Sequence, residues 1–177
     1  MAYLHAFGAY LPERVVSNAE LAARLGCSVE WIEKSTGILE RRWAGEQSSV
    51  AEMGAEAART CLARTGVSRA GMEASQVGLL ILACGSAPPG FPGPAAAVAA
   101  SLGLGTTPAL DLPMASAGSL FGLALAARLA ESYGDILVVA AEKMSAVVQA
   151  HPLDPNTAIL FGDGAGAALV RDRKSVV

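Results

Sequence analysis

Apolar residues form five short runs bounded by glycine, proline or charged residues, as buried β-strands commonly are. The runs cover residues 3–11, 77–84, 108–112, 135–141 and 157–170. Between the runs, apolar side chains recur every three or four positions, which is the spacing of amphipathic helices. Because strands and helices alternate, the pattern predicts an α/β fold with a mostly parallel sheet and right-handed crossovers.

Serine residues mark the expected starts of three helices. Ser17 and Ser49 each stand three positions before a glutamate. This is the spacing of a capping box, in which each of the two side chains accepts the other residue's backbone N–H. Ser28 precedes a further short segment that contains Trp31 and ends near Gly37. These signals predict three helices between the first two strands.

The composition indicates a well-packed protein that does not bind nucleic acid. Of the 177 residues, 53% are hydrophobic and 16% are charged, and the formal net charge is −3. A chain of this length can form one domain with a substantial core, although two small ones are also possible. No basic stripe follows any predicted element, so a nucleic-acid partner is not expected.

The cysteines and the apolar segments favour a cytoplasmic location. Cys27, Cys61 and Cys84 are an odd number at scattered spacings, which does not suggest a disulfide framework. The first residues lack the pattern of a secretory signal, and no apolar segment is long enough to span a membrane. We therefore expect a soluble protein with no membrane partner in a reducing compartment.

The candidate for chemistry is Ser116, at a turn of small residues between the run at 108–112 and an Ala/Leu-rich segment that ends near Ser132. A strand-to-helix turn with small neighbours is a common way for α/β enzymes to expose a nucleophile in front of a helix N-terminus. The alternative is that Ser116 only caps the helix, since serine is among the preferred N-cap residues.

Other residues with chemical potential are assigned structural roles. The glycines at 162–166 lack the spacing of a dinucleotide-binding loop and lie within a predicted strand, so close backbone approach or a bend is expected there. Arg41 and Arg42 are expected at the surface. His5 is expected in the core or at an interface, and His151 in a solvated loop. Cys61, at helical spacing with apolar neighbours, is expected in the core.

Several segments together resemble the β-ketoacyl-[acyl-carrier-protein] synthase III family of the thiolase superfamily. The matching stretches occur in family order at 31–42, 90–94, 111–118, 141–144 and 161–167. The resemblance implies a fold of two duplicated halves, each with a five-stranded mixed sheet between helix layers. Residues 1–177 would form the N-terminal half, a thiolase-like domain. The family's catalytic His and Asn lie in the second half, which this chain lacks.

The resemblance places Ser116 where the family has its nucleophilic cysteine. A helix terminus and nearby cations readily convert a thiol to a thiolate, whereas a serine hydroxyl stays protonated and needs a general base. Ser116 is therefore either a natural replacement, as in relatives that act more as acyltransferases, or an engineered one that traps an acyl substrate.

The resemblance also implies contacts with coenzyme A and with a second subunit. Trp31 matches a residue that contacts the coenzyme A adenine, but two arginines of that site read Ser35 and Pro155 here. Loss of two guanidinium groups removes stacking and phosphate pairing, so carrier-protein-bound acyl groups are the expected donors. Phe91 matches a residue that reaches the neighbouring subunit's acyl tunnel in a homodimer. The alternative is that Phe91 packs on its own domain.

Together these features imply synthase III-like acyl transfer or condensation in fatty acid or polyketide biosynthesis. Acyl-carrier-protein or coenzyme A thioesters would be substrates, with no metal and no bound cofactor, and the 177 residues alone would be inactive. The alternative is a non-catalytic thiolase-fold half that binds acyl chains or a partner chain, and completion in cis or in trans fits both. A serine hydrolase is less favoured, because Gly-x-Ser-x-Gly is absent and no triad can be placed.

Overall fold

The computed structural model describes residues 1–65, 76–149 and 154–172. The chain divides into two compact units. The larger unit contains Met1–Tyr10, Ser49–Glu142 and Ala165–Val177, and the smaller contains Leu11–Ser48 and Lys143–Gly164. Each unit is built from segments that are far apart in the sequence.

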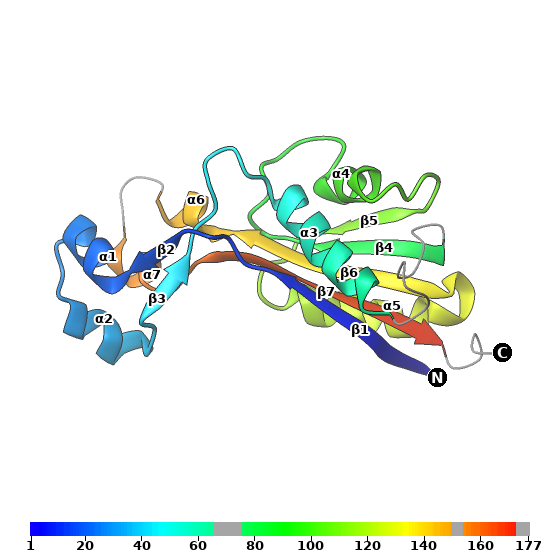
Figure 1. Ribbon diagram of the computed structural model, residues 1–177, viewed down its shortest axis with the longest axis horizontal. Helices are drawn as coiled ribbons and strands as arrows, with labels where there is room; N and C mark the ends of the chain where they lie inside the picture. The colour runs from blue at the N-terminus through cyan, green and yellow to red at the C-terminus, as the bar shows by residue number, and fades with distance from the viewer. Residues whose placement is uncertain (66–75, 150–153, 173–177) are drawn as a thin grey trace. The chain divides into compact units, whose positions relative to one another are not determined.

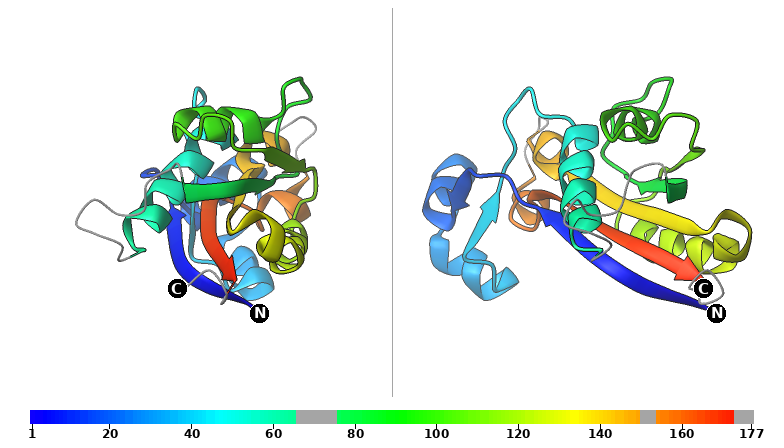
Figure 2. Two further views of the ribbon diagram at one scale, coloured as in Figure 1. Left: turned by 90° about the vertical axis from the view of Figure 1, so that its right-hand side faces the viewer. Right: turned by 45° about the vertical axis from the view of Figure 1, so that its right-hand side comes forward.

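The larger unit is a five-stranded sheet with helices on both faces (Figures 1 and 2). Its elements, some with ends in the smaller unit, are β1 (Ala2–Tyr10), α3 (Val50–Ala63), β4 (Val77–Ala83), α4 (Pro94–Ser101), β5 (Ala109–Leu112), α5 (Gly118–Tyr133), β6 (Asp135–Lys143) and β7 (Asp163–Asp172). The strand order is β1-β7-β6-β4-β5. β4 pairs in parallel with β5 and β6, whereas β1 and β7 are antiparallel, so the sheet is mixed.

Successive residues of β6 point to opposite faces of the sheet and contact different helices. Val138 faces Gly122 of α5, and the next residue, Val139, faces Gly54 of α3. Both glycines lie so close to these valines that an added Cβ would be only 3.0–3.1 Å from the valine methyl carbon. α3 and α4 therefore cover one face of the sheet, and α5 covers the other (Figure 2).

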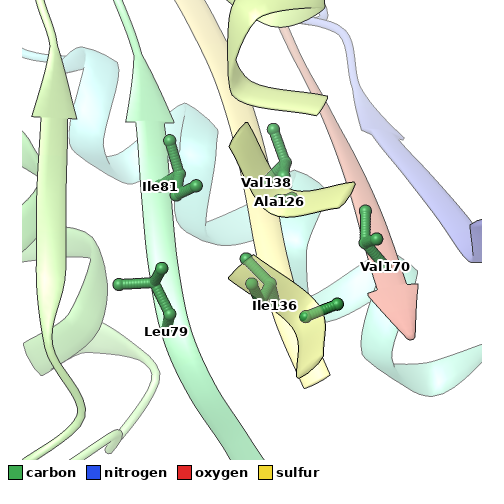
Figure 3. Packing of buried hydrophobic residues seen from close by; sticks show 7 residues of the cluster. Leu79, Ile81, Ala126, Ile136, Val138 and Val170 are labelled. Atoms are coloured by element: carbon green, nitrogen blue, oxygen red, sulfur yellow. The ribbon is translucent and has the colours of Figure 1, made fainter. Parts of the chain in front are cut away.

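The core on the α5 side is aliphatic, as Figure 3 shows. Its buried members come from β4, α5, β6 and β7, and they are Leu79, Ile81, Ala126, Ala130, Ile136, Val138 and Val170. Burial of such side chains stabilises the fold by about 25 cal/mol per Å² of apolar surface removed from water. This packing fixes α5 on the sheet, and with it the turn that precedes α5.

Among its described residues, the smaller unit contains a two-stranded antiparallel sheet and four short helices. These are β2 (Val15–Ser17), α1 (Asn18–Leu25), α2 (Val29–Thr36), β3 (Glu40–Arg42), α6 (Met144–Val148) and α7 (Pro155–Ala158). Its core is centred on Trp43, which is 2% exposed and lies below the guanidinium groups of Arg14 and Arg24.

A buried carboxylate connects three segments of the smaller unit. Asp163 accepts hydrogen bonds from the Ala44 N–H and from both the N–H and the hydroxyl of Ser145, at 2.6–2.7 Å. The adjacent Gly162 has no room for a side chain, because an added Cβ would lie 3.0 Å from the Arg42 carbonyl oxygen. The glycine-rich run therefore serves close backbone approach, as predicted, and Gly164 and Gly166 lie in β7.

Most of the predicted elements are confirmed, and three expectations are wrong. The capping box at Ser17 forms by half, because Ser17 accepts the Glu20 N–H but the Glu20 carboxylate pairs with Arg14 instead. Arg41 is not exposed but buried, since it donates to Asn18 Oδ1 and to the Ile159 carbonyl, and Arg42 is half-buried. The last strand does not begin at residue 157, because Pro155–Ala158 form a helix that is capped by Asp154. His5 lies in β1 as expected, half-buried beside Arg171, and His151 lies outside the described residues.

No helix in the described segments is long and apolar enough to cross a membrane.

Candidate active site

The turn between β5 and α5 holds Ser116 in a rare backbone conformation. β5 ends at Leu112 and α5 begins at Gly118. Ser116 has φ of 54°, in the left-handed region that non-glycine residues seldom adopt. Such a residue costs about 1–3 kcal/mol and persists only where the surroundings impose it, often at an active site. A strained serine at a strand-to-helix turn is typical of an exposed nucleophile.

Ser116 is not the cap of α5. The N-cap position is occupied by Ala117, and α5 has no side-chain cap hydrogen bond. Ser116 is exposed, and its hydroxyl makes no hydrogen bond to any residue that the structure describes, although its carbonyl oxygen accepts one from Ser119 Oγ at 3.5 Å. The capping alternative is therefore wrong, and Ser116 is an exposed residue of the turn that leads into the uncapped N-terminus of α5.

The turn that contains Ser116 packs against the end of β4 and the residues that follow it. An added Cβ on Gly118 would lie 3.0 Å from the Ala83 Cβ, so α5 begins in direct contact with β4. An added Cβ on Gly85 would lie 2.7 Å from the Ala115 backbone nitrogen, so the residue before Ser116 rests on the main chain that follows β4. Both glycines are required by close approach.

Cysteines near the sheet do not replace Ser116 as nucleophile. Cys84 directly follows β4 and is buried, and this burial raises the pKa of its thiol above the usual range. Cys61 is fully buried in α3, as predicted for a core residue, and burial raises its pKa to about 11. Because the thiolate is the reactive form, burial and a raised pKa make both thiols poor candidates for a nucleophile.

Phe91 lies in the loop between β4 and α4 and is 100% exposed. The alternative that this ring packs on its own domain is therefore wrong. The loop is nevertheless anchored, since Asp111 of β5 accepts the Ala95 N–H at 2.8 Å at the start of α4. Phe91 is thus an exposed side chain on a loop whose C-terminal end is held by a hydrogen bond to β5.

Trp31 lies in the smaller unit, on α2, and its side chain is 36% exposed. Ser35, four residues later on the same helix, is also exposed, and Pro155 begins α7. Ser116 and Phe91 belong to the larger unit, so the structure places Trp31 within a different unit from both.

Glu142 is a polar residue of the site that the sequence analysis did not assign. Its carboxylate accepts the N–H groups of Gly85 and Ser86, at 2.7 and 2.8 Å. The sequence held two signals for it, its position directly after the buried run at 135–141 and its place in the matching stretch 141–144. Within the described residues, no group of three His, Cys, Asp or Glu side chains could hold a metal ion.

A mixed five-stranded sheet between helix layers, with a serine at the turn before a helix, defines a thiolase-like α/β fold. The solved 3-oxoacyl-[acyl-carrier-protein] synthase III from Aquifex aeolicus matches it with a TM-score of 0.88 and 33% identity, over 98% of this chain and 55% of that one. The solved priming β-ketosynthase of the R1128 polyketide pathway matches with a TM-score of 0.87 and 34% identity, over 97% of this chain and 50% of that one.

Sequence comparison agrees with the fold. The family model of 3-oxoacyl-[acyl-carrier-protein (ACP)] synthase III matches residues 110–176. A β-ketoacyl-[acyl-carrier-protein] synthase III from Chlamydia pneumoniae is 38% identical over 175 residues, which are 98% of this chain and 50% of that protein. The chain therefore corresponds, in sequence and in fold, to the N-terminal half of the 3-oxoacyl-[acyl-carrier-protein] synthase III family. It spans about half the length of the curated relatives that it matches.

Proposed function

We propose that this chain provides the acyl-accepting half of a synthase III-like acyltransferase of fatty acid or polyketide biosynthesis, with Ser116 as the nucleophile. The observation that carries the proposal is the backbone of Ser116, which has φ of 54° and an exposed hydroxyl in front of α5. A relative from Chlamydia pneumoniae is named as a synthase III, and a structural relative as a priming ketosynthase.

In the proposed step, Ser116 Oγ attacks the carbonyl carbon of an acyl thioester. The Oγ–C bond forms, the C–S bond breaks, and the released thiolate takes up the proton that the hydroxyl loses. The acyl group is then an ester on Ser116. The backbone N–H of Ser116, together with a second backbone N–H from the other half of the family architecture, would stabilise the negative charge on the carbonyl oxygen. The thioester is the substrate, and the step needs neither a metal nor a bound cofactor.

The second half of the family architecture would supply the remaining groups. A serine needs a general base within hydrogen-bond reach, and the Ser116 hydroxyl has no such partner among the described residues. The His and Asn that the family resemblance assigns to the second half would fill this role and bind the acceptor, whether that half is joined in cis or in trans. The 177 residues alone are then inactive in turnover.

An apolar surface on the larger unit supports the need for such a partner. Leu120 and Phe121 of α5 are 69% and 54% exposed. Beside α5 lies an apolar hollow of about 240 Å³ lined in part by Phe7, Leu123 and Ala167. Exposed apolar patches of this kind are typical of interaction sites. The exposed Phe91 is proposed to contact the substrate tunnel of a second subunit in a cytoplasmic homodimer.

The proposed acyl donor is a carrier protein rather than free coenzyme A. Trp31 offers an exposed ring, but Ser35 and Pro155 provide no guanidinium group for phosphate or adenine. A micromolar affinity for acyl-coenzyme A in a titration would contradict this part of the proposal.

The test is the intact mass of the protein after incubation with an acyl-carrier protein or with acyl-coenzyme A. The proposal expects a gain of one acyl group, mapped by peptide analysis to Ser116, that disappears in Ser116→Ala. The measurement is made on the chain alone and with the second half of the Chlamydia pneumoniae relative supplied in trans. A chain that gains no acyl group under any of these conditions would contradict the proposal.

The second candidate is a non-catalytic half that binds acyl chains or a partner chain. It is favoured by one observation, the absence of a hydrogen-bonded base for Ser116 among the described residues. Binding of an acyl carrier or of the second half without any acylation of Ser116 would support this reading.

A further inference from the structure

The carboxylate of Glu142 joins the ends of two neighbouring strands of the larger unit. β6 and β4 are parallel partners, so their carboxyl ends meet at the same edge of the sheet. Glu142 Oε1 accepts the Gly85 N–H at 2.7 Å, and Oε2 accepts the Ser86 N–H at 2.8 Å. Hydrogen bonds to an ionised carboxylate are about twice as strong as neutral ones. Glu142 therefore fixes the first residues of the loop that follows β4.

The turn that contains Ser116 packs directly against this loop. The backbone of Gly85 lies so close to Ala115 that an added Cβ would be 2.5 Å from the Ala115 Cβ and 2.7 Å from its nitrogen. Ala115 directly precedes Ser116, which has a left-handed backbone and leads into a helix without a side-chain cap. Strained residues of this kind depend on the surrounding structure for their conformation.

We propose that Glu142 is a positioning residue, which holds Gly85 and Ser86 against Ala115 and thereby sets the place of Ser116 in front of α5. The inference rests on the proposed function for its catalytic meaning. A carboxylate suits this role because the two N–H groups, and the Cys84 thiol at 3.8 Å from Oε2, are all donors, and all of its lone pairs are acceptors. A glutamine would point its own NH₂ group at one of the two N–H groups.

The test introduces a thiol with S116C and measures its alkylation by iodoacetamide between pH 6 and pH 10, with peptide mapping. The thiol reports its distance from the N-terminus of α5, because the N–H groups there stabilise a thiolate. The rate is compared in S116C, S116C/E142Q, S116C/E142D and S116C/E13Q. Glu13 is exposed, so E13Q removes one charge from the protein without touching the turn. Tm is recorded for every variant.

We expect E142Q to raise the pKa of the new thiol by at least one unit, which lowers the rate below that pKa about tenfold. E142D, which keeps the charge and both acceptors, should restore part of the rate, and E13Q should have no effect. Loss of a negative charge alone would lower the thiol pKa, so a faster reaction in E142Q would overturn the proposal. A lower Tm with an unchanged rate would also overturn it, because it would make Glu142 merely structural.

Failure of the proposed function gives a different result. If wild-type Ser116 is never acylated while E142Q still slows the alkylation of S116C, the acyl-transfer reading fails and the positioning role stands. If Ser116 is acylated at the same rate with and without E142Q, the positioning role fails and the acyl-transfer reading stands.

Discussion

Ser49 and Ser116 each precede a helix of the larger unit, and their backbones differ. Ser49 is extended, with φ of −99° and ψ of 159°, and its hydroxyl accepts the Glu52 N–H at 3.1 Å. The Glu52 carboxylate in turn accepts the Ser49 N–H at 2.8 Å. Ser116 is left-handed, stands one residue before the N-cap, and makes no side-chain bond to the helix.

The comparison shows that a serine before a helix caps it only where the backbone is extended. Extended backbone turns the Ser49 hydroxyl toward the first free N–H groups of α3, so its oxygen stabilises the helix. At the Ser116 turn those groups of α5 have no side-chain cap. They are available to an anion or to the developing oxyanion of a substrate. A side-chain cap therefore stabilises the start of α3, whereas the start of α5 has no such stabilisation.

The largest expected effect is on the reactivity of a thiol placed at position 116. In S116C the new thiol lies before the uncapped end of α5, so its pKa should fall below the usual value of about 8.5. At pH 7 we expect it to be alkylated at least about 100-fold faster than Cys61, whose pKa burial raises to about 11. Peptide mapping after a timed exposure to iodoacetamide measures both sites. Equal rates would mean that the turn does not resemble a nucleophile site.

The next effect concerns the contact between Gly85 and Ala115, the residue before Ser116. Gly85→Ala places a methyl group within 3 Å of Ala115 backbone atoms and should lower the free energy of unfolding by about 1–3 kcal/mol. It should also abolish any acylation of Ser116. Gly90→Ala is the matched control in the same loop, because nothing lies within 4 Å of its added Cβ. Urea denaturation of both variants checks the prediction, which fails if they unfold alike.

Alanine substitution of each serine should affect stability differently, because Ser49 caps a helix and Ser116 does not. Ser49→Ala deletes the capping oxygen and should lower the free energy of unfolding by about 1 kcal/mol. Ser116→Ala removes no hydrogen bond and should change stability by less than about 0.5 kcal/mol, while it abolishes acylation. Chemical denaturation of the two variants provides the measurement. Equal losses of stability would show that Ser116 also caps its helix.

The smallest expected effect concerns backbone strain. Ser116→Gly relieves the cost of a left-handed non-glycine residue but adds flexibility to the unfolded chain, so the net gain in stability should be below about 1 kcal/mol. Ser49→Gly should lose a few tenths of a kcal/mol, since glycine is tolerated at an N-cap. Opposite signs for these two substitutions are the expected outcome in thermal unfolding. A loss of stability in Ser116→Gly would contradict the strain argument.

Local signals along the chain were sufficient for most of the elements. The serines at 17, 28 and 49 each accept the N–H three residues later, as expected of N-caps. The reciprocal bond of the predicted capping box forms at Ser49 but not at Ser17. β4 is buried along nearly its whole length, as expected from an unbroken apolar run. These features depend on neighbours within a few residues. The motifs around Ser116 and the glycine-rich run were likewise sufficient to assign the family and to choose the candidate nucleophile.

Tertiary structure decided the rest, because the partners involved are distant in the sequence. Arg41 is buried since its guanidinium donates to Asn18 and to Ile159, which are 23 and 118 positions away. Glu142 reaches Gly85 across 57 positions. The left-handed backbone of Ser116, one residue before the N-cap Ala117, excludes the helix-cap role that the sequence left open. Local sequence sets which elements form, and packing between remote segments sets which polar groups are buried and which hydroxyl stays exposed.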